Sequence, residues 1–268
     1  MQTGEGSGLI RVATYQRSIR ASIERVWENV FDWEHLPWLH RDSFCGLEHV
    51  ESGPWGWRVH VDLPPADRSR RISLELLVEA EASRYVTRTI GGLGKGTEIW
   101  TRLSATDEET TDIEVEFLLP DVKPEQVDAL GAAMTTLYTK LWDEDELMMM
   151  RRTQLVATGV ADGEKSMCLG TAEEVRTRTP FEVELGGRSY RVLELDRELL
   201  AHTTVCPHLL GPLGDAEVRD GRVVCPWHGY EFDLRTGRSC DGRPLRLRPR
   251  PKLEIDPDST RVTLSLPP

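Results

Sequence analysis

CPHLLGPLGDAEVRDGRVVCPWHGYEFDLRTG, residues 206–237, is the stretch that decides the fold of the C-terminal part of this chain. It holds a Cys-x-His pair, Cys206 and His208, and a Cys-x-x-His pair, Cys225 and His228. Two thiolates and two imidazoles in this order fit a [2Fe-2S] cluster in which the cysteines hold one iron and the histidines hold the other. A structural zinc site usually pairs cysteine with cysteine and histidine with histidine, so it fits less well. A disulfide between the two cysteines would leave both histidines unexplained.

The same stretch resembles the Rieske family. The resemblance implies that these four residues are the cluster ligands, in a small all-β domain that occupies residues 168–268. Rieske proteins of respiratory complexes carry an extra, disulfide-forming cysteine in each loop, and Gly211 and Trp227 stand at those places here. The chain therefore looks like the ferredoxin and oxygenase branch of the family, whose clusters feed electrons to chemistry rather than to a cytochrome.

A chain of 268 residues is long enough for two domains, so the residues before the Rieske-like part need their own explanation. The net charge of −12, from 33 basic and 45 acidic residues, argues against nucleic acid or an anionic membrane as the main partner. The sequence shows no signal-peptide core and no apolar run of membrane-spanning length. We therefore expect a cytoplasmic protein, with Cys45, Cys168 and Cys240 as unpaired thiols.

Residues 8–154 carry the pattern of one strand, short helices, six strands and a long helix. Residues 10–19 read as the first strand, and Ser22 can cap a helix whose apolar side repeats at helical spacing. Turn-like separators then delimit six strand-like segments: 44–51, 55–63, 70–80, 84–90, 96–106 and 111–119. A long amphipathic helix is predicted over about 125–153. This order resembles the START-like (SRPBCC) helix-grip fold, in which an antiparallel sheet surrounds the long helix. The predicted fold class is α+β, with residues 155–167 as a linker.

The segment around the first predicted helix indicates a second metal site. It reads Glu-x₃-Asp-x₂-His-x₄-His, with Glu28, Asp32, His35 and His40 at the named positions. This spacing resembles the mononuclear-iron motif of Rieske oxygenases, which lies in the same region of their START-like domain. The resemblance implies that the two histidines are ligands of an Fe(II) ion and that the long helix supplies a carboxylate.

Helical periodicity selects among the four consecutive acids at residues 143–146. A step of roughly 100° per residue puts Asp145 on the apolar face of the long helix and Asp143 on the far side. A buried lone carboxylate is costly without a cation, so Asp145 is the preferred third ligand and Glu144 is the second choice. Taken alone, the two histidines could also be ordinary surface or core residues.

The family resemblance assigns roles to the two other acids of the motif. Asp32 is implied to connect a cluster histidine, His208 or His228, with His35 of a neighbouring chain, and so to orient the ring and give one electron a short path. Glu28 is expected to line the same junction. A solvated helix carboxylate is an equally good interpretation of Glu28.

These features together predict the oxygenase component of a Rieske system. Electrons from a separate reductase, with or without a ferredoxin, would reach the cluster and then the mononuclear iron. With O₂, the iron would serve to hydroxylate or dealkylate a small, mostly apolar organic substrate. The resemblance implies a homo-oligomer, with a trimer favoured, although the domain order is the reverse of the usual one. Two alternatives remain open: a ferredoxin-like electron carrier fused to an iron-free START-like ligand-binding module, and a START-like carrier or cyclase with the cluster as redox sensor.

Overall fold

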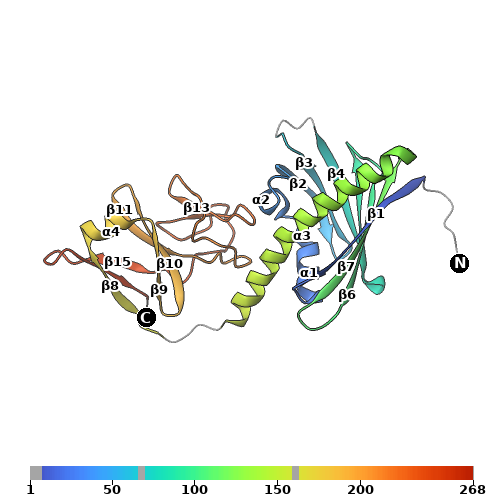
Figure 1. Cartoon of the computed structure of the whole chain (residues 1–268). Coiled ribbons are helices and arrows are strands. Elements are labelled where there is room, and N and C mark those ends of the chain that lie inside the picture. Colours follow the sequence, from blue (N-terminus) through green and yellow to red (C-terminus); the bar gives the residue numbers. More distant parts are fainter. Residues whose placement is uncertain (1–7, 66–69, 159–162, 268) are drawn as a thin grey trace. The chain divides into compact units, whose positions relative to one another are not determined.

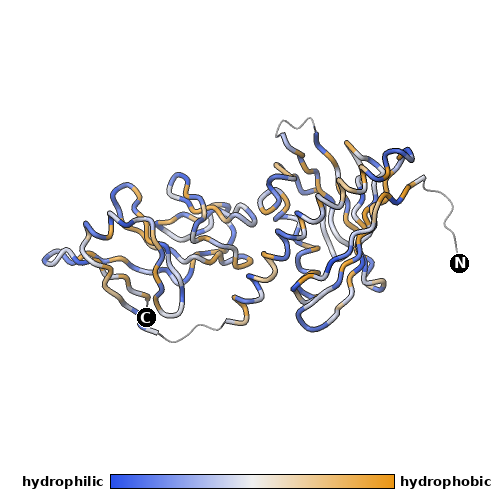
Figure 2. The backbone as a smooth tube through the Cα atoms, viewed as in Figure 1, coloured by the Kyte–Doolittle hydropathy of each residue, from blue (hydrophilic) through white to orange (hydrophobic). Residues whose placement is uncertain are grey.

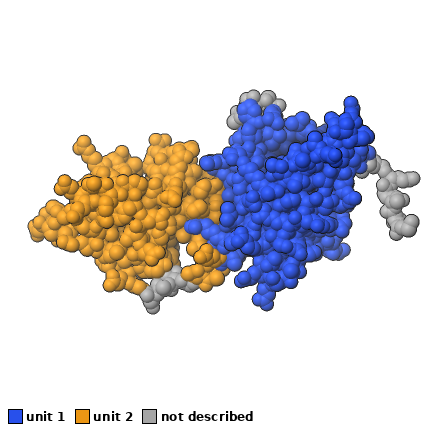
Figure 3. Space-filling model, viewed as in Figure 1, with its two compact units in different colours: residues 1–153 blue, residues 154–268 orange. Residues whose placement is uncertain are grey.

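The computed structural model of the chain describes residues 8–65, 70–158 and 163–267. The chain divides into two compact units, Met1–Thr153 and Gln154–Pro268 (Figure 3). We call them unit 1 and unit 2 and describe each by itself.

Unit 1 is built on one antiparallel sheet of seven strands, in the order β1-β7-β6-β5-β4-β3-β2 (Figure 1). Its strands are β1 (Leu9–Ile19), β2 (Gly46–Gly53), β3 (Gly56–Asp62), β4 (Arg71–Glu79), β5 (Arg84–Gly91), β6 (Glu98–Ala105) and β7 (Thr111–Pro120). Strands β2 to β7 form a meander, and β1 pairs with β7. The seven strands predicted from the sequence are confirmed, each within two residues of the predicted bounds.

The connection between β1 and β2 holds two short helices, α1 (Ile23–Phe31) and α2 (Leu36–Leu39). Ser22 caps α1 as predicted, because its hydroxyl accepts a hydrogen bond from the Arg25 backbone N–H at 3.3 Å. The Trp57 indole N–H donates to the Val30 carbonyl at 2.9 Å and ties the end of α1 to β3. The end of α1 is thereby held against the sheet just before the segment that carries the predicted iron ligands.

The long helix α3 (Val127–Ala157) packs on the same sheet (Figure 1). Its buried Trp142 and Met149 belong to the hydrophobic core that includes Phe117 of β7. Gly131 permits the close approach of α3 to β1, since a Cβ at this position would lie 2.5 Å from the Val12 carbonyl oxygen. A sheet that surrounds one long helix is the helix-grip arrangement, so the predicted fold class of unit 1 is confirmed.

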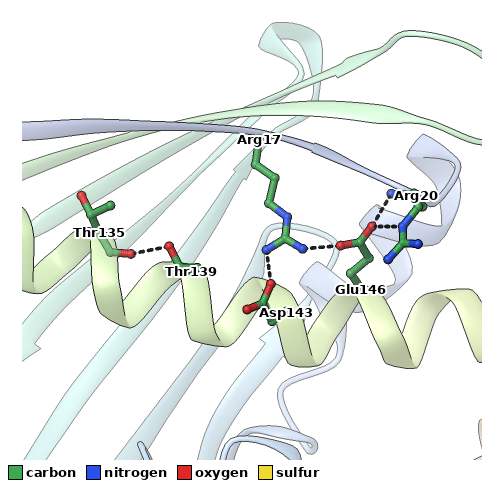
Figure 4. A network of polar contacts seen from close by, with 6 residues as sticks. All are labelled: Arg17, Arg20, Thr135, Thr139, Asp143 and Glu146. Carbon is green, nitrogen blue, oxygen red and sulfur yellow. Dashed lines mark hydrogen bonds and ion pairs between the residues drawn. The ribbon is translucent and has the colours of Figure 1, made fainter.

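Ion pairs join α3 to β1 and to the residue that follows it (Figure 4). The Glu146 carboxylate accepts hydrogen bonds from the Arg17 guanidinium and from Arg20, through Nε at 2.7 Å and the backbone N–H at 3.0 Å. Arg17 also donates to Asp143 at 2.5 Å. Burial raises the pKa of Glu146, but the hydrogen bonds from Arg20 and Arg17 outweigh burial and bring it below its ordinary value. The network fixes the rotation of α3 in the turn that carries the four acids.

The length of α3 does not make it a membrane segment. Its 31 residues could span a bilayer, but four consecutive acids interrupt it. Hydrophobic and hydrophilic residues are interspersed along it (Figure 2). Within the described ranges, no helix is both long and apolar enough to cross a membrane.

Unit 2 is small and mostly β, as predicted, with three sheets of three strands each. The strands are β9 (Phe181–Leu185), β10 (Arg188–Leu195) and β11 (Glu198–Thr203); β12 (Val218–Arg219), β13 (Arg222–Val224) and β14 (Glu231–Asp233); and β8 (Ser166–Thr171), β15 (Lys252–Ile255) and β16 (Arg261–Ser265). The prediction of an all-β domain missed one short helix, α4 (Ala172–Arg178). The side chains of Thr171 and Glu174 cap its N-terminus reciprocally, and Val175 buries it against the core.

The predicted linker at residues 155–167 is shorter in the structure. Helix α3 continues through Ala157, because residues 154–157 contain neither glycine nor proline. Strand β8 already begins at Ser166. Residues 159–162 of the predicted linker lie outside the described residues.

Candidate metal centres

Two loops of unit 2 carry the four predicted cluster ligands. The first loop follows β11 and is closed by two backbone hydrogen bonds of Cys206. The Cys206 N–H donates to the Gly211 carbonyl at 2.9 Å, and the Cys206 carbonyl accepts from the Leu210 N–H at 3.1 Å. Leu210 has a φ of 64°, a left-handed conformation that is uncommon for a leucine.

The second loop, between β13 and β14, repeats this backbone conformation. The Cys225 N–H donates to the Tyr230 carbonyl at 2.9 Å, and the Cys225 carbonyl accepts from the Gly229 N–H at 2.8 Å. Gly229 has a φ of 68° and stands four residues after its cysteine, as Leu210 does in the first loop. The two loops are therefore equivalent in backbone hydrogen bonding, although the histidine lies two residues after the cysteine in one and three in the other.

The fold brings the four predicted ligands together. Cys206 and Cys225 are buried, and the rings of His208 and His228 are nearly perpendicular with centroids 4.6 Å apart. A hydrogen bond from the Cys206 thiol lowers the pKa of Cys225 to about 5, and the same contact together with burial raises the pKa of Cys206. The two thiols thus meet each other and the two imidazoles meet each other, a donor set that suits a cluster with one Cys₂ iron and one His₂ iron.

Gly211 keeps the space beside the cysteines open. A Cβ at this position would lie 2.7 Å from the Cys225 sulfur and 3.2 Å from ring atoms of Trp227. No side chain fits there without displacing the Cys225 sulfur or the indole. Gly211 and Trp227 are thus neighbours in space.

In unit 1, His35, His40 and Asp145 form a compact group of potential metal ligands. His35 precedes α2 and His40 follows it, while Asp145 lies on α3. One ligand atom from each residue can be chosen so that all three lie within 4.8 Å of one another. Asp145 Oδ1 is 3.1 Å from His40 Nε2 and 3.5 Å from His35 Nε2. Two imidazoles and one carboxylate arranged in this way suit a 2-His-1-carboxylate iron site.

A carboxylate stands at the other ring nitrogen of each histidine. Glu144 Oε2 lies 2.6 Å from His40 Nδ1, and Asp32 Oδ2 lies 3.6 Å from His35 Nδ1. The hydrogen bond to Glu144 holds the proton on His40 Nδ1 and leaves His40 Nε2 free to bind a metal, whereas Asp32 is close to His35 Nδ1 but beyond hydrogen-bond distance. Glu144 therefore orients His40 and does not stand beside the His40 Nε2 atom, where Asp145 is found.

The burial of Asp145 is a second indication of a cation site. The residue is 8% exposed, and its Oδ1 atom faces the Nε2 atoms of His40 and His35. Burial raises the pKa of Asp145, but the histidines and a hydrogen bond from Asn29 lower it by more. The pKa therefore lies below its ordinary value, and the carboxylate is ionised. Burial also lowers the pKa of His40, and the charges of Asp145 and Glu144 more than reverse this. A buried anion held among ring nitrogens fits a bound cation.

Several polar residues around this group were not identified from the sequence. Asn29 is buried on α1 and hydrogen-bonds to Asp145, although its position three residues after the buried Val26 already placed it on the inner face of the helix. Tyr85 and Tyr138 are close enough for Asp145 to affect them, and burial raises the pKa of both phenols, which stay neutral. No sequence signal marks these two tyrosines, because each looks like an ordinary core aromatic.

The predicted site residue Glu28 lies on α1 with a half-exposed side chain. It forms ion pairs with Arg25 and, at 3.2 Å, with Arg152 of α3. These contacts suit the solvated-helix interpretation that the sequence left open. A role of Glu28 in the junction stays a prediction.

Comparison with known proteins supports the assignment of unit 2. A family model described as the Rieske [2Fe-2S] domain matches residues 165–248. Over 56 residues, 21% of this chain, the sequence is 41% identical to apoptosis-inducing factor 3 of Mus musculus and of Homo sapiens, and the match spans only 9% of the length of those relatives. Residues 165–248 are therefore a Rieske [2Fe-2S] domain, and a domain of this kind transfers electrons.

Solved structures similar to parts of the chain have low sequence identity to it. The Zhui aromatase/cyclase from Streptomyces sp. R1128 is 14% identical, with a TM-score of 0.45, covering 55% of this chain and 98% of that one. The ferredoxin of carbazole 1,9a-dioxygenase from Nocardioides aromaticivorans IC177 is 20% identical, with a TM-score of 0.32, covering 38% of this chain and 98% of that one.

Proposed function

We propose that this chain is the oxygenase component of a Rieske system, which uses its [2Fe-2S] cluster to feed electrons to a mononuclear non-heme iron. The observation that carries the proposal is the group of His35, His40 and Asp145 in a chain that also holds a Rieske domain. An electron-transfer domain needs an acceptor, and a 2-His-1-carboxylate site is a known centre for O₂ chemistry. When bound, the iron would supply activation of O₂ for hydroxylation or dealkylation of a small, mostly apolar substrate.

The residues of unit 1 have separate roles in this proposal. His35 and His40 would offer Nε2 and Asp145 would offer Oδ1 to an Fe(II) ion. Glu144 keeps the Nδ1 proton of His40 in place. Asp32 orients His35 and is proposed to connect it with a cluster histidine, within one chain or between chains of an oligomer.

Electrons would come from a separate reductase, directly or through a ferredoxin. The sequence has no nucleotide-binding fingerprint after a strand, and its glycine-rich segment 91–96 runs from the last residue of β5 into the loop before β6. We therefore propose that NAD(P)H is oxidised by a partner protein.

Iron counting tests the proposal against the alternative of an electron carrier fused to an iron-free ligand-binding module. Iron and acid-labile sulfide are measured after anaerobic loading with Fe(II). We expect about three irons and two sulfides per chain in the wild type, and about two irons in a His35→Ala/His40→Ala variant. His49→Ala, which removes an exposed histidine of the same unit, is the matched control and should keep three. A wild type with cluster iron alone supports the iron-free module and contradicts the oxygenase.

Asp32→Asn tests the connection between the centres. The substitution keeps the size of the side chain and removes its charge, so the cluster should assemble and accept an electron from dithionite as before. Reoxidation of the reduced cluster by O₂ and substrate should slow, because the path through His35 loses its anionic link. Unchanged reoxidation kinetics would rule out the connecting role.

A further inference from the structure

Unit 2 has a pocket of about 840 Å³ with an unusual charge distribution. Six basic side chains line it, and no acidic side chain does: Lys165, Arg188, Arg238, Arg246, Arg248 and Arg250. We call it the arginine pocket. Its lining shares no residue with the cluster loops, so the proposed function does not account for it.

Backbone contacts bring the walls of the arginine pocket together from distant parts of unit 2. Arg238 and Arg246 pair across an antiparallel bridge, and the Leu247 N–H donates to the Gly237 carbonyl at 2.8 Å. On another wall, the Leu266 N–H donates to the Lys165 carbonyl at 2.8 Å. The basic side chains therefore project from backbone that the fold itself holds in place.

The six cations lack the partners that other arginines of unit 2 have. Within the described ranges, none of the six side chains forms an ion pair or donates a hydrogen bond. By contrast, Arg222 pairs with Glu231 at 2.9 Å, and Arg235 pairs with Asp196 at 2.8 Å. Like charges directly opposite across two strands repel each other. The chain carries a net charge of −12, yet no acidic side chain of the described residues neutralises this group, which leaves its charges available to an external anion.

We propose that the arginine pocket binds a small organic polyphosphate of the nucleotide type. Its volume lies within the range of about 300 to 1,000 Å³ that is common for small-molecule sites. Planar guanidinium groups match phosphate oxygens with paired hydrogen bonds, and several phosphoryl charges close together suit several arginines close together. Leu247, Pro249 and Leu266 also line the pocket and offer apolar surface to the organic part of the ligand. A concave site of this size suits a compact anion better than an acidic protein surface.

Calorimetric titration of the full, cluster-loaded chain tests this proposal, with ATP, pyrophosphate and a hexaglutamate peptide as probes at about 150 mM salt, where weak surface attraction is screened. We expect ATP to bind at one site and pyrophosphate to compete with it. Arg246→Gln/Arg248→Gln should weaken ATP binding at least about tenfold, because hydrogen bonds to charged groups are lost. Arg219→Gln/Arg222→Gln, whose arginines pair with Glu217 and Glu231, is the matched control and should bind ATP as the wild type does.

The visible absorbance of the cluster verifies that both variants are folded. ATP binding that is equally strong in the two double variants would overturn the proposal, as would ATP binding that pyrophosphate does not displace. Binding of hexaglutamate without binding of ATP would assign the pocket to an acidic protein partner instead. None of these results depends on the iron content of unit 1. The experiment therefore tests the arginine pocket independently of the proposed function.

Discussion

The two candidate metal centres differ in how the chain assembles them. The predicted cluster ligands lie within residues 206–228, on two loops whose backbones have the same hydrogen-bonding pattern. The iron-site group joins two histidines around α2 with Asp145, which lies more than a hundred residues later in the sequence. A ligand set on short loops leaves a motif in the sequence, whereas a set that spans a domain depends on how a helix is rotated against a sheet.

The two centres also differ in what orients their ligands. Backbone hydrogen bonds from Cys206 and Cys225 close the cluster loops, so the loop conformation itself orients the sulfurs. In unit 1, side-chain carboxylates stand behind the imidazoles, with Glu144 at His40 and Asp32 at His35. Single substitutions beside the iron-site group should therefore have graded effects, while the loss of one cluster ligand should be complete.

The largest effect is expected for Cys225→Ser. This variant should lose the visible absorbance and the acid-labile sulfide of the cluster completely, because the buried Cys225 thiolate is the predicted partner of Cys206 in binding a single iron. Cys240→Ser changes an exposed cysteine and should keep the cluster. Fe(II) added to Cys225→Ser should still bind at His35, His40 and Asp145. A Cys225→Ser protein with a normal sulfide content would contradict the ligand assignment.

A large effect on stability, confined to unit 1, is expected for Glu146→Ala. The free energy of unfolding should fall by about 2 to 4 kcal/mol, because Arg17 and Arg20 lose a buried carboxylate partner. Asp143→Ala removes the exposed acid of the same network and should cost less than about 1 kcal/mol. Urea unfolding followed by tryptophan fluorescence measures this, since every tryptophan except Trp227 lies in unit 1. Equal costs for the two variants would show that burial of Glu146 contributes nothing.

An intermediate effect is expected for Glu144→Gln. The affinity of unit 1 for Fe(II), measured by anaerobic competition with a chelator, should fall about 10- to 100-fold, because His40 loses the carboxylate at its Nδ1 atom. Asp145→Asn should reduce the affinity more, and Asp143→Asn should leave it unchanged. If Glu144→Gln is as severe as Asp145→Asn, Glu144 is itself a ligand and the assignment of the third ligand must be revised.

The smallest effect is expected from pH, in unit 2. Burial lowers the pKa of His202 to about 4, from an ordinary value of 6.5, and its Nδ1–H donates to the Thr203 carbonyl. A buried histidine that stays neutral stabilises the fold at any pH above the pKa that the same histidine has in the unfolded chain. This contribution is lost as the pH falls from about 6.5 towards 4. At pH 5 the loss should be about 2 kcal/mol relative to pH 7.

His202→Gln cannot be protonated and serves as the control for this pH effect. The difference in the free energy of unfolding between wild type and variant, measured for unit 2 at pH 7 and pH 5, should shrink at the lower pH. A difference that does not depend on pH would contradict the buried, neutral state of His202.

Periodicity predicted much of the fold, and motif spacing predicted much of the candidate sites. All seven strands of unit 1 were recognised, because turn-like residues separate segments with strand character. The burial of Asp145 and the exposure of Asp143 followed from helical geometry alone. The same geometry did not reveal that Glu146 is buried, because its cover is supplied by arginines of β1 and the following turn. Leu210 could not be anticipated in a left-handed conformation, since leucine rarely adopts one.

The sequence could predict the cluster ligands because Cys206, His208, Cys225 and His228 are close together in the chain and their residue types are rare in this combination. The different contacts of the four acids at 143–146 were determined only by the tertiary structure. Asp143 reaches solvent and Arg17, and Glu144 orients His40. Asp145 faces two ring nitrogens, and Glu146 is buried under two arginines. Four consecutive helical residues point in four directions, and only the elements packed around α3 determine what each of them meets.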